Sequence, residues 1–190
     1  MLKKKTPLVL HQVSNFASGL GNSILMITIP WLILQETRSP AFAGLVAAIS
    51  AIPGLIISPI GGWLVDHVGR RAVSVCADLL SSLAVFAFPI VALTYGLSSF
   101  SILLIAVVGA IFDPAGYTAR KTLLADVAKA SEIELDRLNG IHDGFMGISW
   151  ILGPAAGAGL ISTVGAINSF WVAGGLFIFA ALTIAFLRVG

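Results

Sequence analysis

Three aspartates, Asp78, Asp113 and Asp143, interrupt stretches of sequence that are otherwise apolar. A carboxylate at the middle of an apolar membrane helix costs roughly 2.5–3.5 kcal/mol on insertion scales, so each of them needs a compensating role. A carboxylate that faces an apolar cavity can take up and release a proton. The three aspartates are therefore candidates for proton coupling.

Each aspartate also has a purely structural interpretation. Asp78 could form an ion pair with one of the paired arginines in the preceding loop, and Asp113 could cap backbone groups freed by Pro114. Asp143, next to His142, could lie in water at the end of a helix. The amides of Asn15 and Asn22 leave the same choice, between substrate contacts in a cavity and hydrogen bonds between helices.

The other reactive side chains show no catalytic or metal-binding spacing. The single cysteine, Cys76, cannot form an intramolecular disulfide, and the three histidines lie far apart with no HExxH-like pair. Gly116-Tyr117-Thr118-Ala119-Arg120 resembles part of a segment of the membrane alcohol phosphotransferases, but the aspartates that those enzymes need around it are missing. We therefore expect no metal, no cofactor and no enzymatic activity.

The composition points to a chain surrounded by lipid. Of 190 residues, 57% are hydrophobic and 11% are charged, and the mean hydropathy is +0.99. A soluble domain carries about 25% charged residues, which is more than this chain has to cover a surface in water. The basic residues are mostly scattered singly or in pairs, so nucleic acid is not an expected partner.

Six segments are long and apolar enough to cross a bilayer as helices. The whole chain, 1–190, is thus expected to be a single all-α integral membrane domain. Between the fourth and fifth segments we expect a longer, polar cytoplasmic loop, 118–140, with a short amphipathic helix beginning near Ser131. The six predicted spans are 13–34, 41–65, 72–93, 100–117, 141–163 and 169–187.

The distribution of basic residues predicts the orientation. With the N-terminus in the cytoplasm, only Arg38 lies outside, and the following lie inside: Lys3, Lys4, Lys5, Arg70, Arg71, Arg120, Lys121, Lys129, Arg137 and Arg188. This is a strong positive-inside bias, so both termini are expected to be cytoplasmic. A cleaved signal peptide is the rival interpretation of residues 1–34, but the apolar stretch is too long and lacks a clear cleavage site.

Small residues recur at every fourth position in two of the predicted spans. The rows are Ser50, Gly54, Ser58 and Gly62 in the second span, and Ser149, Gly153 and Gly157 in the fifth. Such rows let helices approach closely, which is ordinary bundle packing. The segments 49–54 and 148–153 also match at an offset of 99 residues, which pairs span two with span five. This predicts a three-plus-three inverted repeat, the construction of transporter halves.

The loop after the second span has the pattern G-x-x-x-D-x-x-G-R-R, formed by Gly62, Asp66, Gly69, Arg70 and Arg71. Gly62 would allow a close helix crossing, Gly69 a turn with positive φ, and Asp66 could pair with either arginine. The pattern resembles the signature loop of the major facilitator superfamily, in which this loop is a conformational latch between two halves. The resemblance implies a gating role for these five residues.

A second element extends the resemblance. Gly153, Pro154 and Gly157 form G-P-x-x-G, which is similar to an element of the family's antiporters, with Ala158 in place of the last glycine and Ser149 in place of an earlier one. Stretches such as Phe112-Asp113-Pro114-Ala115 resemble the branch of macrolide and enterobactin exporters. The resemblance implies proton-coupled efflux of a small amphiphilic molecule by alternating access, in a cell membrane.

Members of this family have twelve or more spans, so the resemblance implies half of a twelve-helix transporter. The second six-helix half would come from the same chain, if the sequence is a fragment, or from another subunit. A non-transporting remnant or an assembly partner of a transporter is the alternative.

Overall fold

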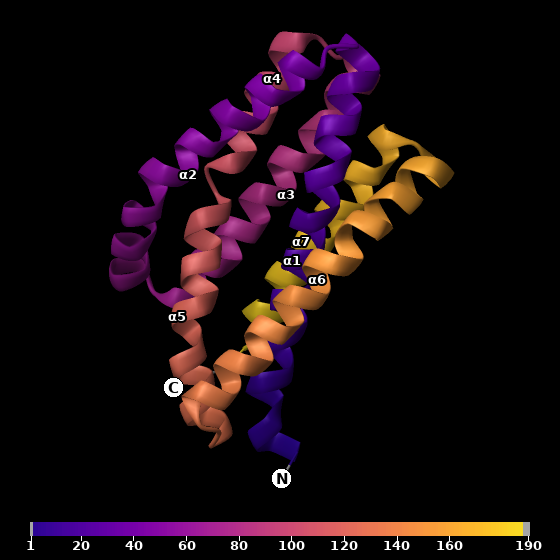
Figure 1. Cartoon of the computed structure of the whole chain (residues 1–190). Coiled ribbons are helices and arrows are strands. Elements are labelled where there is room, and N and C mark those ends of the chain that lie inside the picture. The colour runs from indigo at the N-terminus through magenta and orange to yellow at the C-terminus, as the bar shows by residue number, and fades with distance from the viewer. Residues whose placement is uncertain (1, 188–190) are drawn as a thin grey trace.

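The computed structural model describes residues 2–187, with side chains from residue 5 onward, as a bundle of long helices (Figure 1). Six stretches are long and apolar enough to span a membrane: Lys5–Thr37, Pro40–Val68, Arg70–Thr94, Ser99–Ser131, Leu135–Val164 and Ala166–Ala185. The predicted all-α fold with six spans is confirmed. The helices are α1 (Leu2–Thr37), α2 (Pro40–Val68), α3 (Arg70–Thr94), α4 (Ser99–Ala110), α5 (Asp113–Ser131), α6 (Leu135–Val164) and α7 (Ala166–Ala185).

Short connections with specific turn residues separate the helices. Gly69 and Gly165 have φ values of 100° and 86°, which an L side chain adopts only with strain, and each forms the one-residue link between two helices. Ser39 caps α2 by accepting a hydrogen bond from the backbone N–H of Phe42, and Ser98 and Ser101 form a capping box at the start of α4. Tight links of this kind fold successive spans back against each other.

The fourth span is interrupted near its middle, between α4 and α5. Ile111 and Phe112 form a turn, and α5 begins at Asp113 with Pro114 in its first turn. Proline has no N–H to donate to the carbonyl of Ala110, and its ring disfavours helical geometry at the preceding residue. The interruption therefore follows from the Asp113-Pro114 pair, and it places Asp113 at the break.

The expected cytoplasmic loop, 118–140, is wrong in its extent. Residues 118–131 continue α5, residues 135–140 open α6, and only 132–134 connect them, with Glu132 in the left-handed conformation. The predicted helix start near Ser131 is instead a helix end. The buried side chains of Ala119, Leu123 and Val127 recur at helical spacing on one face of α5. The helical spacing was not recognised in the sequence because the segment also carries many charged residues.

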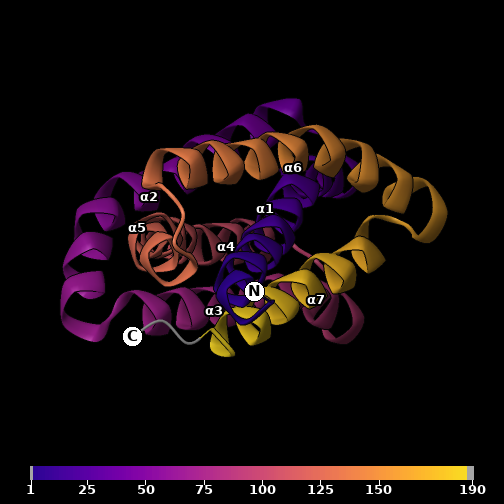
Figure 2. The same ribbon diagram turned by 90° about the horizontal axis from the view of Figure 1, so that it is seen from below.

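The packing of the spans has the symmetry of a three-plus-three repeat. The first span, α1, packs on α6 and α7, and the fourth span, α4 with α5, packs on α2 and α3. The third and sixth spans, α3 and α7, pack on each other. Exchanging spans 1–3 with spans 4–6 leaves this set of contacts unchanged, and Figure 2 shows α1 lying between the α4–α5 span and α7.

The buried apolar core lies where α1, α3, α4 and α7 meet. Its centre includes Phe88 and Phe170, whose rings stack with centroids 4.4 Å apart. Spans α2 and α6 are the least buried, and their exposed large side chains include Leu55 at 78% and Ile151 at 74%. An apolar surface of this kind is stable against lipid and not against water.

Candidate functional site

A cavity of about 780 Å³ lies inside the bundle, beside the break between α4 and α5. Most of its lining is aliphatic or aromatic, including Leu25, Met26, Val85, Phe88 and Phe177. A small polar group interrupts this lining: Asn15, Asn22, Ser23, Ser50, Ser81, Asp113, Tyr117, Arg120 and Asp143. An apolar cavity with a few polar groups is the usual form of a small-molecule site.

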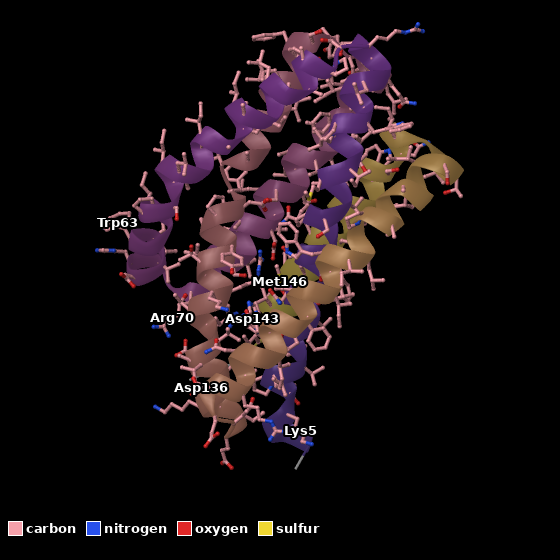
Figure 3. The ribbon with its side chains drawn as sticks, viewed as in Figure 1. Lys5, Trp63, Arg70, Asp136, Asp143 and Met146 are labelled. Carbon is pink, nitrogen blue, oxygen red and sulfur yellow. The ribbon has the colours of Figure 1, made fainter. Side chains whose placement is uncertain are left out.

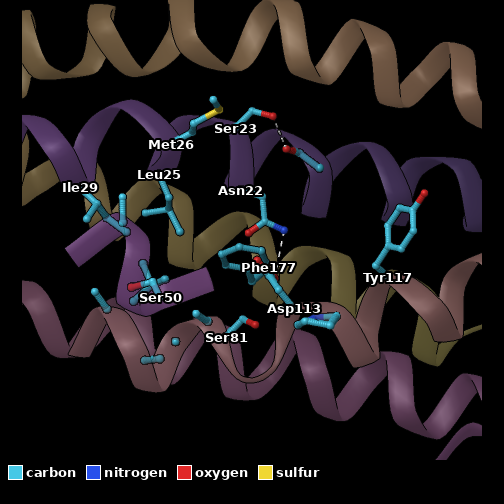
Figure 4. Close-up of a pocket in the computed structure, with 18 of the residues that line it drawn as sticks. Asn22, Ser23, Leu25, Met26, Ile29, Ser50, Ser81, Asp113, Tyr117 and Phe177 are labelled. Carbon is cyan, nitrogen blue, oxygen red and sulfur yellow. Dashed lines mark hydrogen bonds between the residues drawn. The ribbon is translucent and has the colours of Figure 1, made fainter. Parts of the chain in front are cut away.

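Asp113 and Asn22 form the polar contact at the centre of this lining (Figure 4). The Asn22 side-chain amide donates to Asp113 Oδ1 at 3.1 Å. Asp113 does not cap the backbone at Pro114 through any hydrogen bond found in the described residues; its partner comes from α1, far away in sequence. Asn15 also lines the cavity, and the side-chain nitrogen of this residue has no protein partner among the described side chains. A substrate contact at either amide stays a prediction.

Asp78 lies in a buried ion pair. Arg120 donates to Asp78 Oδ1 at 2.8 Å, and the Ser18 hydroxyl donates to the same oxygen at 2.9 Å. The two charged side chains are only 6% and 2% exposed. The prediction that Asp78 pairs with Arg70 or Arg71 is wrong, because Asp78 lies two turns into α3 and faces α5 and α1. Arg120, expected in a cytoplasmic loop, is inside the bundle because its segment is helical.

Asp143 and His142 are neighbours in sequence with different surroundings. The side chain of Asp143 is 63% exposed and accepts a hydrogen bond from Lys121 Nζ at 2.7 Å. His142 is buried, and its ring lies 5.7 Å from that of His11, measured between centroids. Asp143 is exposed as predicted and His142 is not, and neither lies at a helix end, because α6 begins at Leu135. Figure 3 shows Asp143 and Met146 on the same stretch of α6.

The start of α3 is tied to neighbouring helices through Arg70 and Arg71. Arg70 donates to both carboxylate oxygens of Asp126 on α5 at 2.9 Å, and Arg71 donates to the backbone carbonyl of Ala185 on α7. The expected pair between Asp66 and either arginine does not form, and within the described part of the chain Asp66 has no ion pair. Gly69 has the positive φ that the turn was expected to need.

The close crossing expected at Gly62 occurs instead at Gly61. A Cβ on Gly61 would lie 3.1 Å from the Cα of Ala115 on α5, whereas nothing lies within 4 Å of a Cβ on Gly62. A row spaced strictly by four residues drifts around a helix that has 3.6 residues per turn. Gly62 has therefore rotated away from the inward face by the end of α2.

Gly153 and Gly157 bring α6 against α1. A Cβ on Gly153 would lie 2.1 Å from Ser23 Cβ, and one on Gly157 would lie 3.1 Å from the carbonyl oxygen of Ile24. Pro154 lies between them inside the continuous helix α6. This element thus supports the wall of the cavity that Ser23 lines.

The polar residues that contact Asp78 and His142 inside the bundle were not predicted from the sequence. Ser18, Arg120 and His11 were not singled out, although His11, Asn15, Ser18 and Asn22 are spaced by four, three and four residues and share one face of α1. That spacing was the available signal. It was hidden because the first span was expected to begin at residue 13.

Six spans in two three-span repeats, folded around a cavity that holds a carboxylate at a helix break, define one half of an α-helical membrane transporter. The chain belongs to the Major Facilitator Superfamily, whose family model matches residues 13–190. It is therefore a multi-pass membrane protein of a transporter family.

Named relatives agree with this assignment. The chain is 39% identical to the Multidrug efflux pump Tap of Mycolicibacterium fortuitum over 98% of its own length and 46% of that protein's. It is 36% identical to the Multidrug efflux pump Tap of Mycobacterium tuberculosis, over 96% and 44% of the two chains. It is 25% identical to the Macrolide efflux protein A of Streptococcus pyogenes, over 90% and 42%. The chain thus spans about half the length of the curated relatives it matches.

Proposed function

We propose that this chain forms the N-terminal half of a secondary active transporter that exports a small amphiphilic molecule in exchange for protons. The observation that carries the proposal is the cavity of about 780 Å³ with Asp113 in its otherwise mainly apolar lining. Its volume lies within the range of roughly 300–1,000 Å³ that accommodates small ligands. The names of the relatives, a multidrug efflux pump and a macrolide efflux protein, support the same cargo class.

Asp113 is the proposed coupling carboxylate. It lines the cavity, and its hydrogen-bond partner is the neutral amide of Asn22, so either a proton or a substrate amine can compensate its charge. Asp78 already has the Arg120 guanidinium as its counter-ion, and Asp143 has Lys121. These two carboxylates are therefore second candidates for the same role.

The proposed gate is the α2–α3 loop, with Gly62, Asp66, Gly69, Arg70 and Arg71. Arg70 links the start of α3 to Asp126 on α5, and both side chains are partly exposed, so the contact can break at low cost. A second six-helix half, from the same protein or another subunit, would cover the cavity and rock against this one in alternating access. Gly153, Pro154 and Gly157 would keep α1 and α6 moving as one unit.

The proposed location is the cell membrane, with both termini in the cytoplasm. Lys5 and Arg70 lie toward the same end of the bundle (Figure 3), as the positive-inside rule requires of cytoplasmic residues. The side chains of Lys3 and Lys4, and Arg188, belong to the same prediction but lie outside the described part of the structure.

The test measures transport by the natural protein that contains this chain, in inverted membrane vesicles of a strain deleted for its own pumps. An imposed pH gradient, acidic inside, is expected to drive accumulation of the fluorescent lipophilic cation ethidium. Asp113→Asn is expected to lose this accumulation, and the exposed Asp136→Asn serves as the matched control. Accumulation that is the same in the two variants would contradict the assignment to Asp113. If the wild-type protein transports nothing, the alternative applies, a non-transporting remnant or assembly partner.

A further inference from the structure

A row of polar side chains runs along one face of α1, away from the cavity and toward the end of the bundle. It consists of His11, Asn15, Ser18 and Asn22. At a rise of 1.5 Å per residue the row is roughly 16 Å long. His11, Asn15 and Ser18 are polar but buried inside an apolar bundle. Burying polar side chains costs free energy, so the row needs a physical reason.

Three of the four residues of the row contact an ionisable residue. Asn22 donates to Asp113 at the cavity, and Ser18 donates to Asp78, the partner of Arg120. His11 Nε2 lies 3.0 Å from the backbone carbonyl oxygen of Arg120, which fixes the ring against α5. The row thus connects the cavity carboxylate with the buried ion pair and then with an imidazole.

The far end of the row is a pair of buried histidines. His11 and His142 are 0% and 1% exposed, and their ring centroids lie 5.7 Å apart. Neither ring lines the cavity, so the row leaves the cavity before it reaches them. Titratable and charged groups that face the pair from neighbouring helices are Arg120 and Lys121 on α5 and Asp143 on α6. Asp143, which follows His142 in sequence, is mostly exposed and lines the cavity.

Several buried polar atoms on α1, α3 and α6 have no partner within the described part of the protein. Among them are His11 Nδ1, both ring nitrogens of His142, both amide atoms of Gln12, Asn15 Nδ2 and Asp78 Oδ2. Each buried polar atom left without a hydrogen bond costs about 1–3 kcal/mol. Buried waters commonly satisfy such groups, with about three hydrogen bonds each. The concentration of these atoms on α1, α3 and α6 therefore marks a binding site for internal water.

We propose that His11 and His142, with Gln12 and Asn15, hold water molecules that carry protons between Asp113 and the solvent-exposed side chain of Asp143. The inference rests on the proposed proton coupling. A proton that leaves the carboxyl group of Asp113 passes to water along the row. One nitrogen of His142 then accepts a proton while the other releases one, which leaves the ring neutral in its other tautomer until a ring rotation resets it. His11 takes part through Nδ1 alone, because its Nε2 faces the Arg120 carbonyl. The proton enters solvent beside Asp143.

The histidine pair is the part of this path that lies outside the cavity, whereas Asn15, Asn22 and Asp143 line it. The cavity lining is mostly apolar, and an amphiphilic molecule that fills the cavity displaces water from it. Because neither imidazole lines the cavity, a proton held at the pair is separated from the substrate.

The test uses the natural protein in proteoliposomes with ethidium as the substrate probe. Transport driven by a pH gradient is compared with exchange of ethidium at equal pH on both sides, which needs binding and alternating access but no net proton movement. His11→Gln and His142→Gln are expected to reduce gradient-driven transport by roughly tenfold or more and to leave exchange nearly unchanged. The matched control is His67→Gln, whose ring stacks on Trp63 at the exposed end of α2.

The outcomes separate the two proposals. Wild-type protein that transports ethidium in neither assay overturns the proposed function, and the proton path falls with it. Wild-type transport with gradient-driven rates unchanged in the histidine variants overturns the proton path alone. Equal losses in both assays also overturn it, because they show a structural role for the pair.

Discussion

The contact between Gly153 on α6 and Ser23 on α1 gives the sharpest test of the packing. A Cβ built on Gly153 lies 2.1 Å from Ser23 Cβ and 3.1 Å from the Cα and carbonyl carbon of Ser23. Carbon atoms in contact normally lie about 3.5–4.0 Å apart, so α1 and α6 must separate by roughly 1.5 Å to admit a methyl group. Rotating the Ser23 side chain cannot relieve the clash, because the position of Cβ is fixed by the backbone.

Gly153→Ala is therefore expected to destabilise the protein by about 1–3 kcal/mol through overpacking. Gly159→Ala is the matched control on the same helix, because nothing lies within 4 Å of a Cβ at that position. The gain in helix propensity, up to about 1 kcal/mol, is common to both substitutions. The difference in stability between the two variants thus reports the packing of α1 on α6.

The assay is thermal unfolding of the purified protein in detergent, followed by the fluorescence of a dye that binds the exposed core. Gly157→Ala, with 3.1 Å to the Ile24 carbonyl oxygen, completes the series. The expected order of midpoints is Gly159→Ala highest, then Gly157→Ala, then Gly153→Ala. A midpoint for Gly153→Ala equal to that of Gly159→Ala would refute the close approach of the two helices.

Two ion pairs give the remaining predictions. Arg120→Gln leaves Asp78 buried without its counter-ion and is expected to cost about 3–5 kcal/mol in unfolding free energy. Adding Asp78→Asn should recover most of that loss. A double variant as unstable as the single one would show that the broken ion pair is not the cause. Asp126→Asn breaks the partly exposed pair with Arg70 and is expected to cost less than about 1 kcal/mol. The same variant should slow transport, as measured by ethidium accumulation, and an unchanged rate would argue against a gating role for this contact.

Helix existence was predictable from the sequence, and helix ends were less so. Hydropathy locates six spans because a bilayer demands about 20 apolar residues in each, a constraint that acts on local sequence alone. The same criterion failed at 118–140, where charges interrupt the apolar pattern. Three of those charges pair with a residue on another span: Arg120 with Asp78, Lys121 with Asp143, and Asp126 with Arg70.

The sequence by itself determined the local features: the positive φ at Gly69, the break before Asp113-Pro114, and the small residues at which α6 approaches α1. These depend on the conformational limits of single residues and on side-chain volume. Only the tertiary structure decided which side chains meet, such as Asn22 with Asp113 or Arg70 with Asp126. The physical reason is that such pairs join residues 56 or 91 positions apart, and their partners are fixed by helix rotation and crossing, which local sequence does not specify.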